Sequence, residues 1–465
     1  MTQTPTTSSS SRDSGRTRAP EPRRGRLRLI ALAVTGVLLG TGAGLLLLRE
    51  RTPQPSSATQ AQAATTDLGD ELAALQAKVD RSPDDIGAWQ SLAVVAVRRA
   101  AQLGDPAYYE IARRAVDRAD EVVADDPQTL VARGELALAL HDFDDALRYG
   151  ERAQREMRDN VVVLGVVVDA QVELGRYDDA AETLQRMLDV RPSVSALSRA
   201  SYLRELTGDL EGARTAMRQA ETAASGATAG RATVTALRGD LAFQAGDLQL
   251  AAEHYASALE ASPDLVAAAV GAARVQAAGG DLDAAEEALS AVVERLPTPD
   301  AVTLLADVQR LQGDDAAAEA NDELARTLSR LQAEQGQAVD LELALFEADR
   351  GDDPARAVTL ARRASEERPD NVYAADALAW ALARDGDVAE ARRLLRDALR
   401  LGSVDPLVRF HAAWILARDG DTDAAREHLT FVAERNPWFS FALLDEAGEL
   451  ADELDVPRPP AWDRG

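Results

Sequence analysis

The sequence contains no cysteine, a single lysine (Lys78), four histidines and only 4% aromatic residues. Without cysteine, the chain cannot form disulfides, thiolate nucleophiles, cysteine-ligated zinc sites or iron–sulfur clusters. The single lysine argues against Schiff-base chemistry, and the four histidines are too scattered to suggest a metal site. Because 46% of the residues are hydrophobic and few of them carry rings, we expect a core of alanine, leucine and valine.

Motifs of the common enzyme classes are also missing. The sequence has no Gly-x-x-x-x-Gly-Lys-Ser/Thr phosphate loop, no His-Glu-x-x-His pair and no Gly-x-Ser-x-Gly turn. The two valine runs, at 161–163 and 166–168, fall within expected helices, so no strand-like stretch is left for an α/β catalytic domain. Carboxylates are plentiful, but acids on helix surfaces are usually solvated. We therefore expect a protein that is not an enzyme and binds no cofactor or metal.

Positive charge is scarce outside the N-terminus. The chain has 51 Lys and Arg against 78 Asp and Glu, a net charge of −27. Residues 1–51 hold nine Arg and three acids (+6), so the other 414 residues carry −33, which is −27 minus +6. Nucleic-acid binding needs clustered cations to neutralise phosphates. An acidic body of this kind predicts that neither DNA nor RNA is a partner.

One segment is long and apolar enough to be a transmembrane helix. Residues 29–48 are 20 uncharged residues, and such a helix spans a hydrocarbon core of about 30 Å. Only Arg49 and Arg51 closely follow this segment, whereas six arginines lie in residues 16–28 just before it: Arg16, Arg18, Arg23, Arg24, Arg26 and Arg28. This asymmetry predicts a cytoplasmic N-terminus and an extracytoplasmic body.

A cleaved signal peptide is the alternative, because small residues such as Ala61 and Ala63 follow the segment. Signal peptides usually have an apolar core of about 7–15 residues, however, so we favour an uncleaved anchor. Around it, the composition predicts a disordered basic cytoplasmic tail over residues 1–28 and a flexible linker over residues 49–66. Gly36, Gly40 and Gly44 share one helix face and make a homodimer a candidate, although glycine is common in spanning helices anyway.

A repeat of about 34 residues occupies most of the remaining chain. Gly-Asp pairs recur at 208–209, 246–247, 280–281, 313–314, 351–352, 386–387 and 420–421. When the turns are aligned on one residue each, alanine stands five residues later every time, at Ala146, Ala180, Ala213, Ala251, Ala285, Ala318, Ala357, Ala391 and Ala425. The aligned residues are His141, Gly175, Gly208, Gly246, Gly280, Gly313, Asp352, Gly386 and Gly420. Proline recurs 17 residues after several turns and ends a helix there. Each unit is therefore expected to be a helix–turn–helix pair.

Over residues 86–437 these units resemble the tetratricopeptide repeat (TPR), with its small residue in the first helix, Gly-Asp turn and recurring alanine. The resemblance implies an all-α solenoid of about ten repeats, preceded here by the single transmembrane helix. We expect the solenoid with its capping helices over residues 67–455, a leading half-repeat over 67–80, a trailing cap helix over 438–454 and a C-terminal tail over 456–465. Three spacings are irregular, near 104–141, 208–246 and 313–352, and the GATAG segment at 226–230 is either a flexible joint or a longer loop.

The resemblance also implies which residues face the concave groove. In TPR proteins the first helices line this surface, and one facing position lies about six residues before the turn. Here this position is occupied by Glu135, Asp169, Tyr202, Asp240, Arg274, Asp307, Phe346, Trp380 and Trp414. The groove is therefore expected to have an acidic middle and an aromatic end.

We predict a peptide-binding site at the aromatic end, because rigid aromatics are frequent anchors of bound peptides. The predicted site consists of Phe346, Trp380, Trp414, Tyr373, Asp376, Arg350, Arg384, Phe410 and Arg418. Its three arginines recur 34 residues apart and are able to grip an acidic or C-terminal carboxylate segment. The alternative is that the rings fill gaps between stacked helices and that the arginines simply favour helix C-termini.

The sequence as a whole predicts a membrane-anchored scaffold that binds a protein or peptide and assists the assembly of an envelope or transport complex. Two alternatives are a secreted binding protein with a cleaved leader and a cytoplasm-facing regulatory subunit of an enzyme complex.

Overall fold

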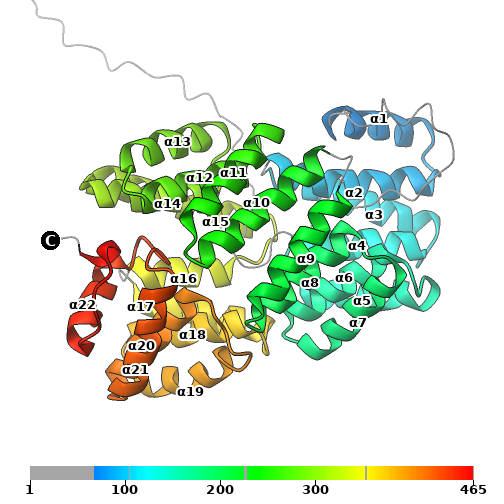
Figure 1. The fold of residues 1–465 in the computed structure, drawn as a ribbon. Coiled ribbons are helices and arrows are strands. Elements are labelled where there is room, and N and C mark those ends of the chain that lie inside the picture. The colour runs from blue at the N-terminus through cyan, green and yellow to red at the C-terminus, as the bar shows by residue number, and fades with distance from the viewer. Residues whose placement is uncertain (1–67, 104, 225–227, 351–352, 464–465) are drawn as a thin grey trace, which may run out of the picture. The chain divides into compact units, whose positions relative to one another are not determined.

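The computed structural model describes residues 68–103, 105–224, 228–350 and 353–463. The predicted tail (1–28), membrane helix (29–48), linker (49–66) and glycine face (Gly36, Gly40, Gly44) lie outside the described residues, as does part of segment 226–230. Within the described ranges the regular structure is entirely helical, and consecutive helices lie side by side in pairs (Figure 1). None of these helices combines the length and apolarity that crossing a membrane requires.

Ten helix pairs follow one another between single helices at the two ends of the described region, α1 (Leu68–Arg81) and α22 (Leu444–Leu454). The pairs are α2 (Ile86–Leu103) with α3 (Ala107–Val122), α4 (Pro127–Ala139) with α5 (Phe143–Glu156), α6 (Val161–Glu173) with α7 (Tyr177–Val190), α8 (Val194–Leu206) with α9 (Leu210–Ala223), α10 (Thr228–Gln244) with α11 (Leu248–Ala261), α12 (Val266–Ala278) with α13 (Leu282–Arg295), α14 (Pro299–Gln312) with α15 (Asp315–Glu334), α16 (Asp340–Arg350) with α17 (Pro354–Glu367), α18 (Val372–Arg384) with α19 (Val388–Ala398), and α20 (Pro406–Asp419) with α21 (Thr422–Arg435). The irregular spacings coincide with long helices, such as the 20 residues of α15 and the 17 of α10.

The recurring Gly-Asp pair has a structural cause. Glycine at the end of a first helix adopts positive φ, for example 79° at Gly208 and 87° at Gly280, which an L side chain resists. The following aspartate caps the second helix, and at Asp281 the Oδ1 atom accepts a hydrogen bond from the backbone N–H of Ala284. Together the two residues end one helix and begin the next within a few positions.

The recurring alanines lie where paired helices approach most closely. Each of the nine has zero exposed surface: Ala146, Ala180, Ala213, Ala251, Ala285, Ala318, Ala357, Ala391 and Ala425. Side chains seven positions later are also buried, including those of Ala258 and Ala398. A methyl group at these points allows the two helix backbones to pack without a gap.

Replacing one of these alanines by leucine should therefore overpack the helix pair. We expect Ala251→Leu or Ala391→Leu to lower the free energy of unfolding by about 1–3 kcal/mol in thermal or urea unfolding. Glu253→Gln on the exposed face of α11 is the control and should change it by less than about 0.5 kcal/mol. Equal destabilisation by the leucine and glutamine variants would contradict the alignment of the repeats, which places these alanines between paired helices.

Turns of the early pairs also contact loops that lie far along the chain. At the α4–α5 turn, His141 stands where most pairs have glycine and has a φ of 61°. Its Nδ1 lies 2.7 Å from the carbonyl oxygen of Ala338, and the N–H of Ala338 donates to the carbonyl of Leu140 at 3.0 Å. These two hydrogen bonds offset the strain of about 1–2 kcal/mol that positive φ imposes on a residue with a Cβ.

Two further turns make contacts of the same kind. Near the α6–α7 turn, the Asn371 side chain donates to the carbonyl of Glu173 at 3.0 Å, and the N–H of Val372 donates to the Tyr177 hydroxyl at 3.0 Å. Near the α10–α11 turn, Asn436 donates to the carbonyl of Phe243 at 2.9 Å. Repeats separated by nearly 200 residues are therefore hydrogen-bonded to one another, in addition to the contacts between neighbours.

The C-terminal end differs in detail from the expectation. The cap helix predicted over 438–454 begins only at Leu444, and ahead of it the Asn436 side chain accepts a hydrogen bond from the N–H of Trp438 at 3.0 Å. Beyond α22, the tail folds back so that Trp462 is 1% exposed and its Nε1–H donates to the carbonyl of Pro437 at 2.8 Å. The described part of the tail thus contributes to the cap of the last repeat.

Candidate interaction site

The predicted aromatic site is placed on three successive first helices, α16, α18 and α20, but its rings do not form an open row. Trp380 is completely buried, whereas Phe346 and Trp414 are partly buried. The Trp380 ring stacks on His411 at 4.3 Å and meets Trp414 edge-on at 5.4 Å between centroids, and its Nε1–H donates to Asp349 at 2.8 Å. Of the two alternatives, a ring that faces a ligand and a ring that fills a gap between stacked helices, Trp380 follows the second.

Phe410 and Asp376, also predicted to line the groove, are buried as well, with 0% and 2% exposure. An Asp376 carboxylate oxygen lies 2.9 Å from the Nδ1 atom of His411. Burial alone would lower the pKa of His411, but the neighbouring Asp376 carboxylate, with Asp349 and Asp405 nearby, raises it above the usual value. Asp376, which was predicted to line the groove, is therefore paired with the buried side chain of His411.

Tyr373 is half-buried and packs against two apolar clusters, and burial raises its pKa well above the usual value.

The three predicted arginines are paired with carboxylates of the chain itself. Arg384 lies 2.6 Å from Glu446, and Arg418 lies 2.7 Å from Glu453, so the cap helix α22 supplies both acids. Arg350 lies 2.7 Å from Asp307 and 3.4 Å from Asp322. The chemistry expected for a bound acidic segment is thus present, but internal carboxylates occupy it.

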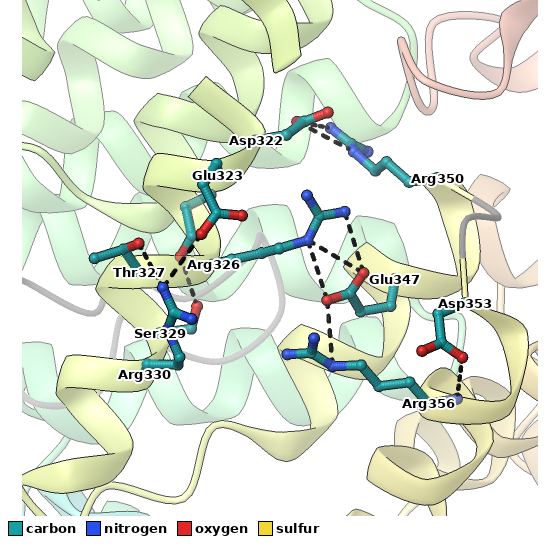
Figure 2. A network of polar contacts seen from close by, with 11 residues as sticks. Asp322, Glu323, Arg326, Thr327, Ser329, Arg330, Glu347, Arg350, Asp353 and Arg356 are labelled. Carbon is teal, nitrogen blue, oxygen red and sulfur yellow. Dashed lines mark hydrogen bonds and ion pairs between the residues drawn. The ribbon is translucent and has the colours of Figure 1, made fainter. Parts of the chain in front are cut away.

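Arg350 belongs to a polar network at the joint between α15 and α16, where the backbones of the two helices do not pack closely. Figure 2 shows long side chains bridging the joint: Arg350 reaches Asp322 of α15, and Arg326 of α15 reaches Glu347 of α16 at 3.2 Å. Arg356 of α17 approaches the same Glu347 carboxylate at 3.5 Å. Phe346 of α16 packs against an apolar cluster that includes Ala325 and Leu328 of α15, so ion pairs and hydrogen bonds supplement apolar contact at this connection.

Burial at this joint changes the acidity of its groups. It raises the pKa of Asp307 to about 6, although Arg350 and Arg310 oppose the shift. Burial alone would lower the pKa of Arg350, but Asp307 and Asp322 raise it. The Arg350 guanidinium therefore opposes the effect of burial on the Asp307 pKa, and its ion pairs with Asp307 and Asp322 connect α16 to α14 and α15.

A pocket of about 260 Å³ lies beside the network, between α15, α16 and α17. We call it the joint pocket, and its lining residues are Ser329, Arg330, Ala333, Val339, Asp340, Leu343, Arg356, Thr359, Leu360 and Arg363. Sequence reasoning did not find these residues, because most of them lie on second helices or at the joint. The only sequence signal was the long spacing between the turns at 313 and 352, which reflects the extended helix α15.

Comparison with known families and structures gives the following similarities. Residues 137–201 and 242–308 match one family model described as tetratricopeptide repeat, and residues 341–406 and 377–437 match a second with the same description. The chain is similar to a thermophilic TPR protein of Thermus thermophilus, with 21% identity, a TM-score of 0.35 and coverage of 39% of this chain and 96% of that one.

Two further similarities are to the human IFIT1 dimer with PPP-AAAA (16% identity, TM-score 0.45, 68% and 73% coverage) and to a tetratricopeptide repeat protein from Parabacteroides merdae (15% identity, TM-score 0.37, 52% and 96% coverage). No curated protein sequence matches the chain.

Proposed function

Because the chain carries tetratricopeptide repeats, we propose that it is a scaffold that binds a protein or peptide partner on its helix array. The observation that carries this proposal is the repeat itself, since proteins built from it typically act as non-enzymatic binding scaffolds. A stack of helix pairs exposes an extended surface along which a partner is able to contact several units at once. The partner would be a component of an envelope or transport complex, and no catalytic step is part of the proposal.

We further propose that residues 29–48 anchor this scaffold in a bacterial cell membrane, with the repeats outside the cytoplasm. The length of the apolar segment and the six arginines of residues 16–28 just before it support this topology. Under the same proposal, Gly36, Gly40 and Gly44 are the face through which two anchors would pair.

A reporter enzyme that is active only outside the cytoplasm tests the orientation. Fused after Gly465, it should be active in cells, while a reporter that is active only in the cytoplasm should be silent at the same point. The reverse pattern with a stable fusion would contradict the topology and favour a cytoplasm-facing subunit. The mass of the exported form separates the anchored protein from a secreted one with a cleaved leader.

Crosslinking in membranes tests the binding function. The full chain should retain a specific protein after crosslinking and purification, while a matched chain ending at residue 66 should not. Equal recovery with both chains would contradict binding by the repeats and leave only the anchor as the site of contact.

A further inference from the structure

Arginines outnumber carboxylates among the residues that line the joint pocket, although the protein is strongly acidic. Its lining includes three arginines (Arg330, Arg356 and Arg363) and one carboxylate, Asp340, whereas the chain as a whole has a net charge of −27. Asp340 pairs with Arg363 at 2.9 Å. Arg356 and Arg326 both pair with the Glu347 carboxylate, so this one acid forms ion pairs with two arginines.

Arg330 is the cation most open to a new partner. It pairs with Glu323 at 3.2 Å, and the two side chains are 58% and 60% exposed. Exposed pairs of this kind contribute only about 0–1 kcal/mol, so a better-placed anion readily replaces the internal one. Figure 2 shows Arg330 on α15 and Arg356 extending from α17.

Beneath these cations the pocket is apolar. Val339, Leu343 and Leu360 line it and are 7%, 8% and 5% exposed, and Ala333 completes the apolar part. Pockets for whole cofactors or drug-sized ligands usually measure about 300–1,000 Å³. At about 260 Å³ the joint pocket has room for one large side chain rather than for a complete cofactor.

We propose that the joint pocket binds a partner segment in which one large apolar side chain is flanked by carboxylates. The apolar side chain enters between Leu343 and Leu360, and the carboxylates pair with Arg330, Arg356 and Arg363. This inference rests on the proposed function, because it names the kind of segment that the scaffold would hold. Like charge argues against the chain's own N-terminal segment as the occupant, since residues 1–51 carry +6.

Fluorescence anisotropy with the full chain in detergent tests the proposal. The probe is a fluorescein-labelled Gly-Asp-Glu-Phe-Asp-Glu-Gly peptide, which should bind saturably and more weakly as salt rises. Arg330→Gln and Arg363→Gln should each weaken binding about tenfold. The control Arg393→Gln changes an exposed arginine of α19 and should leave binding unchanged. Circular dichroism of all variants verifies that each is folded.

Two control peptides test the chemistry without altering the protein. Replacing the phenylalanine by serine, or the four acids by lysine, should each abolish saturable binding. No saturable binding of the acidic probe to the wild-type chain, equal binding of the lysine peptide, or equal loss in Arg330→Gln and Arg393→Gln would each overturn the proposal. Two other occupants of the pocket are tested in the same way: a second copy of the chain, by self-association, and a membrane surface, by binding to phosphatidylglycerol vesicles. Either one would overturn the peptide assignment if Arg330→Gln and Arg363→Gln abolish that interaction and the acidic probe does not compete with it.

Partner capture from membranes separates this proposal from the function on which it rests. If wild-type and Arg363→Gln chains capture the same crosslinked protein equally well and the probe does not bind, the pocket assignment fails and the scaffold function stands. If the probe binds as expected but neither chain captures a protein, the scaffold function fails and the peptide site stands.

Discussion

Replacing Trp380 by alanine should lower the free energy of unfolding by about 3–5 kcal/mol, which would be among the largest effects of any single substitution in the chain. The ring is fully buried, stacks on His411 and donates a hydrogen bond to Asp349, so its removal leaves a cavity and a partly buried carboxylate without this donor. Thermal and urea unfolding of the purified full chain measure the loss.

Trp414→Ala is the matched control, because this ring belongs to the same cluster but is only partly buried. Its loss of stability should be clearly smaller than that of Trp380→Ala. Capture of the crosslinked partner, measured per folded molecule, should be unchanged in Trp380→Ala. A variant that melts like the wild type but no longer captures the partner would restore the sequence-based prediction of an open aromatic groove.

Gly175→Ala should be the most damaging of the glycine substitutions at the turns. The residue has a φ of 72°, and a Cβ atom there would overlap the carbonyl group of Asp370 in the remote loop before α18. Positive φ alone costs an alanine about 1–2 kcal/mol, and forcing the two segments apart adds about 1–3 kcal/mol. Urea unfolding should therefore show a loss of about 2–5 kcal/mol.

Gly386→Ala isolates the first of these two costs. Its φ is 95°, and a Cβ atom added there would meet no heavy atom within 4 Å beyond its own chain neighbours, so only the backbone strain of about 1–2 kcal/mol is expected. Gly246→Ala should behave like Gly175→Ala, because its Cβ would overlap the carbonyl of Arg435. Equal losses at Gly175 and Gly386 would show that the remote contact contributes nothing to stability.

The sequence predicted those features that recur with the repeat. The helix pairs, the turns and the nine alanines follow from a period of about 34 residues, because each unit has the same neighbours and needs the same side chains at the same places. Asp281 and the other capping aspartates are visible for the same reason: a cap is a local interaction that depends on three or four consecutive residues.

Features that depend on contacts outside this period were missed. The burial of Trp380 depends on how tightly α18 and α20 pack, and a ring six residues before a turn has the same sequence signature in a core as in a groove. The partners of Arg384 and Arg418 come from α22, which lies beyond the last recognisable repeat. The joint pocket arises where α15 runs longer than its counterparts, so the period of the repeat gives no sign of it.

The hydrogen bonds between early turns and late loops have a consequence for how the protein folds. A solenoid whose units touch only their neighbours frays from its ends and tolerates removal of terminal repeats one at a time. Here the bond from His141 to Ala338 and that from Asn371 to Glu173 join segments 197 and 198 residues apart. Closing such large loops slows folding and links the two regions in a single cooperative transition. Deleting the last two helix pairs, α18 with α19 and α20 with α21, should consequently destabilise α6 and α10. In an array whose units contact only their neighbours, the same deletion would leave the stability of α6 and α10 unchanged.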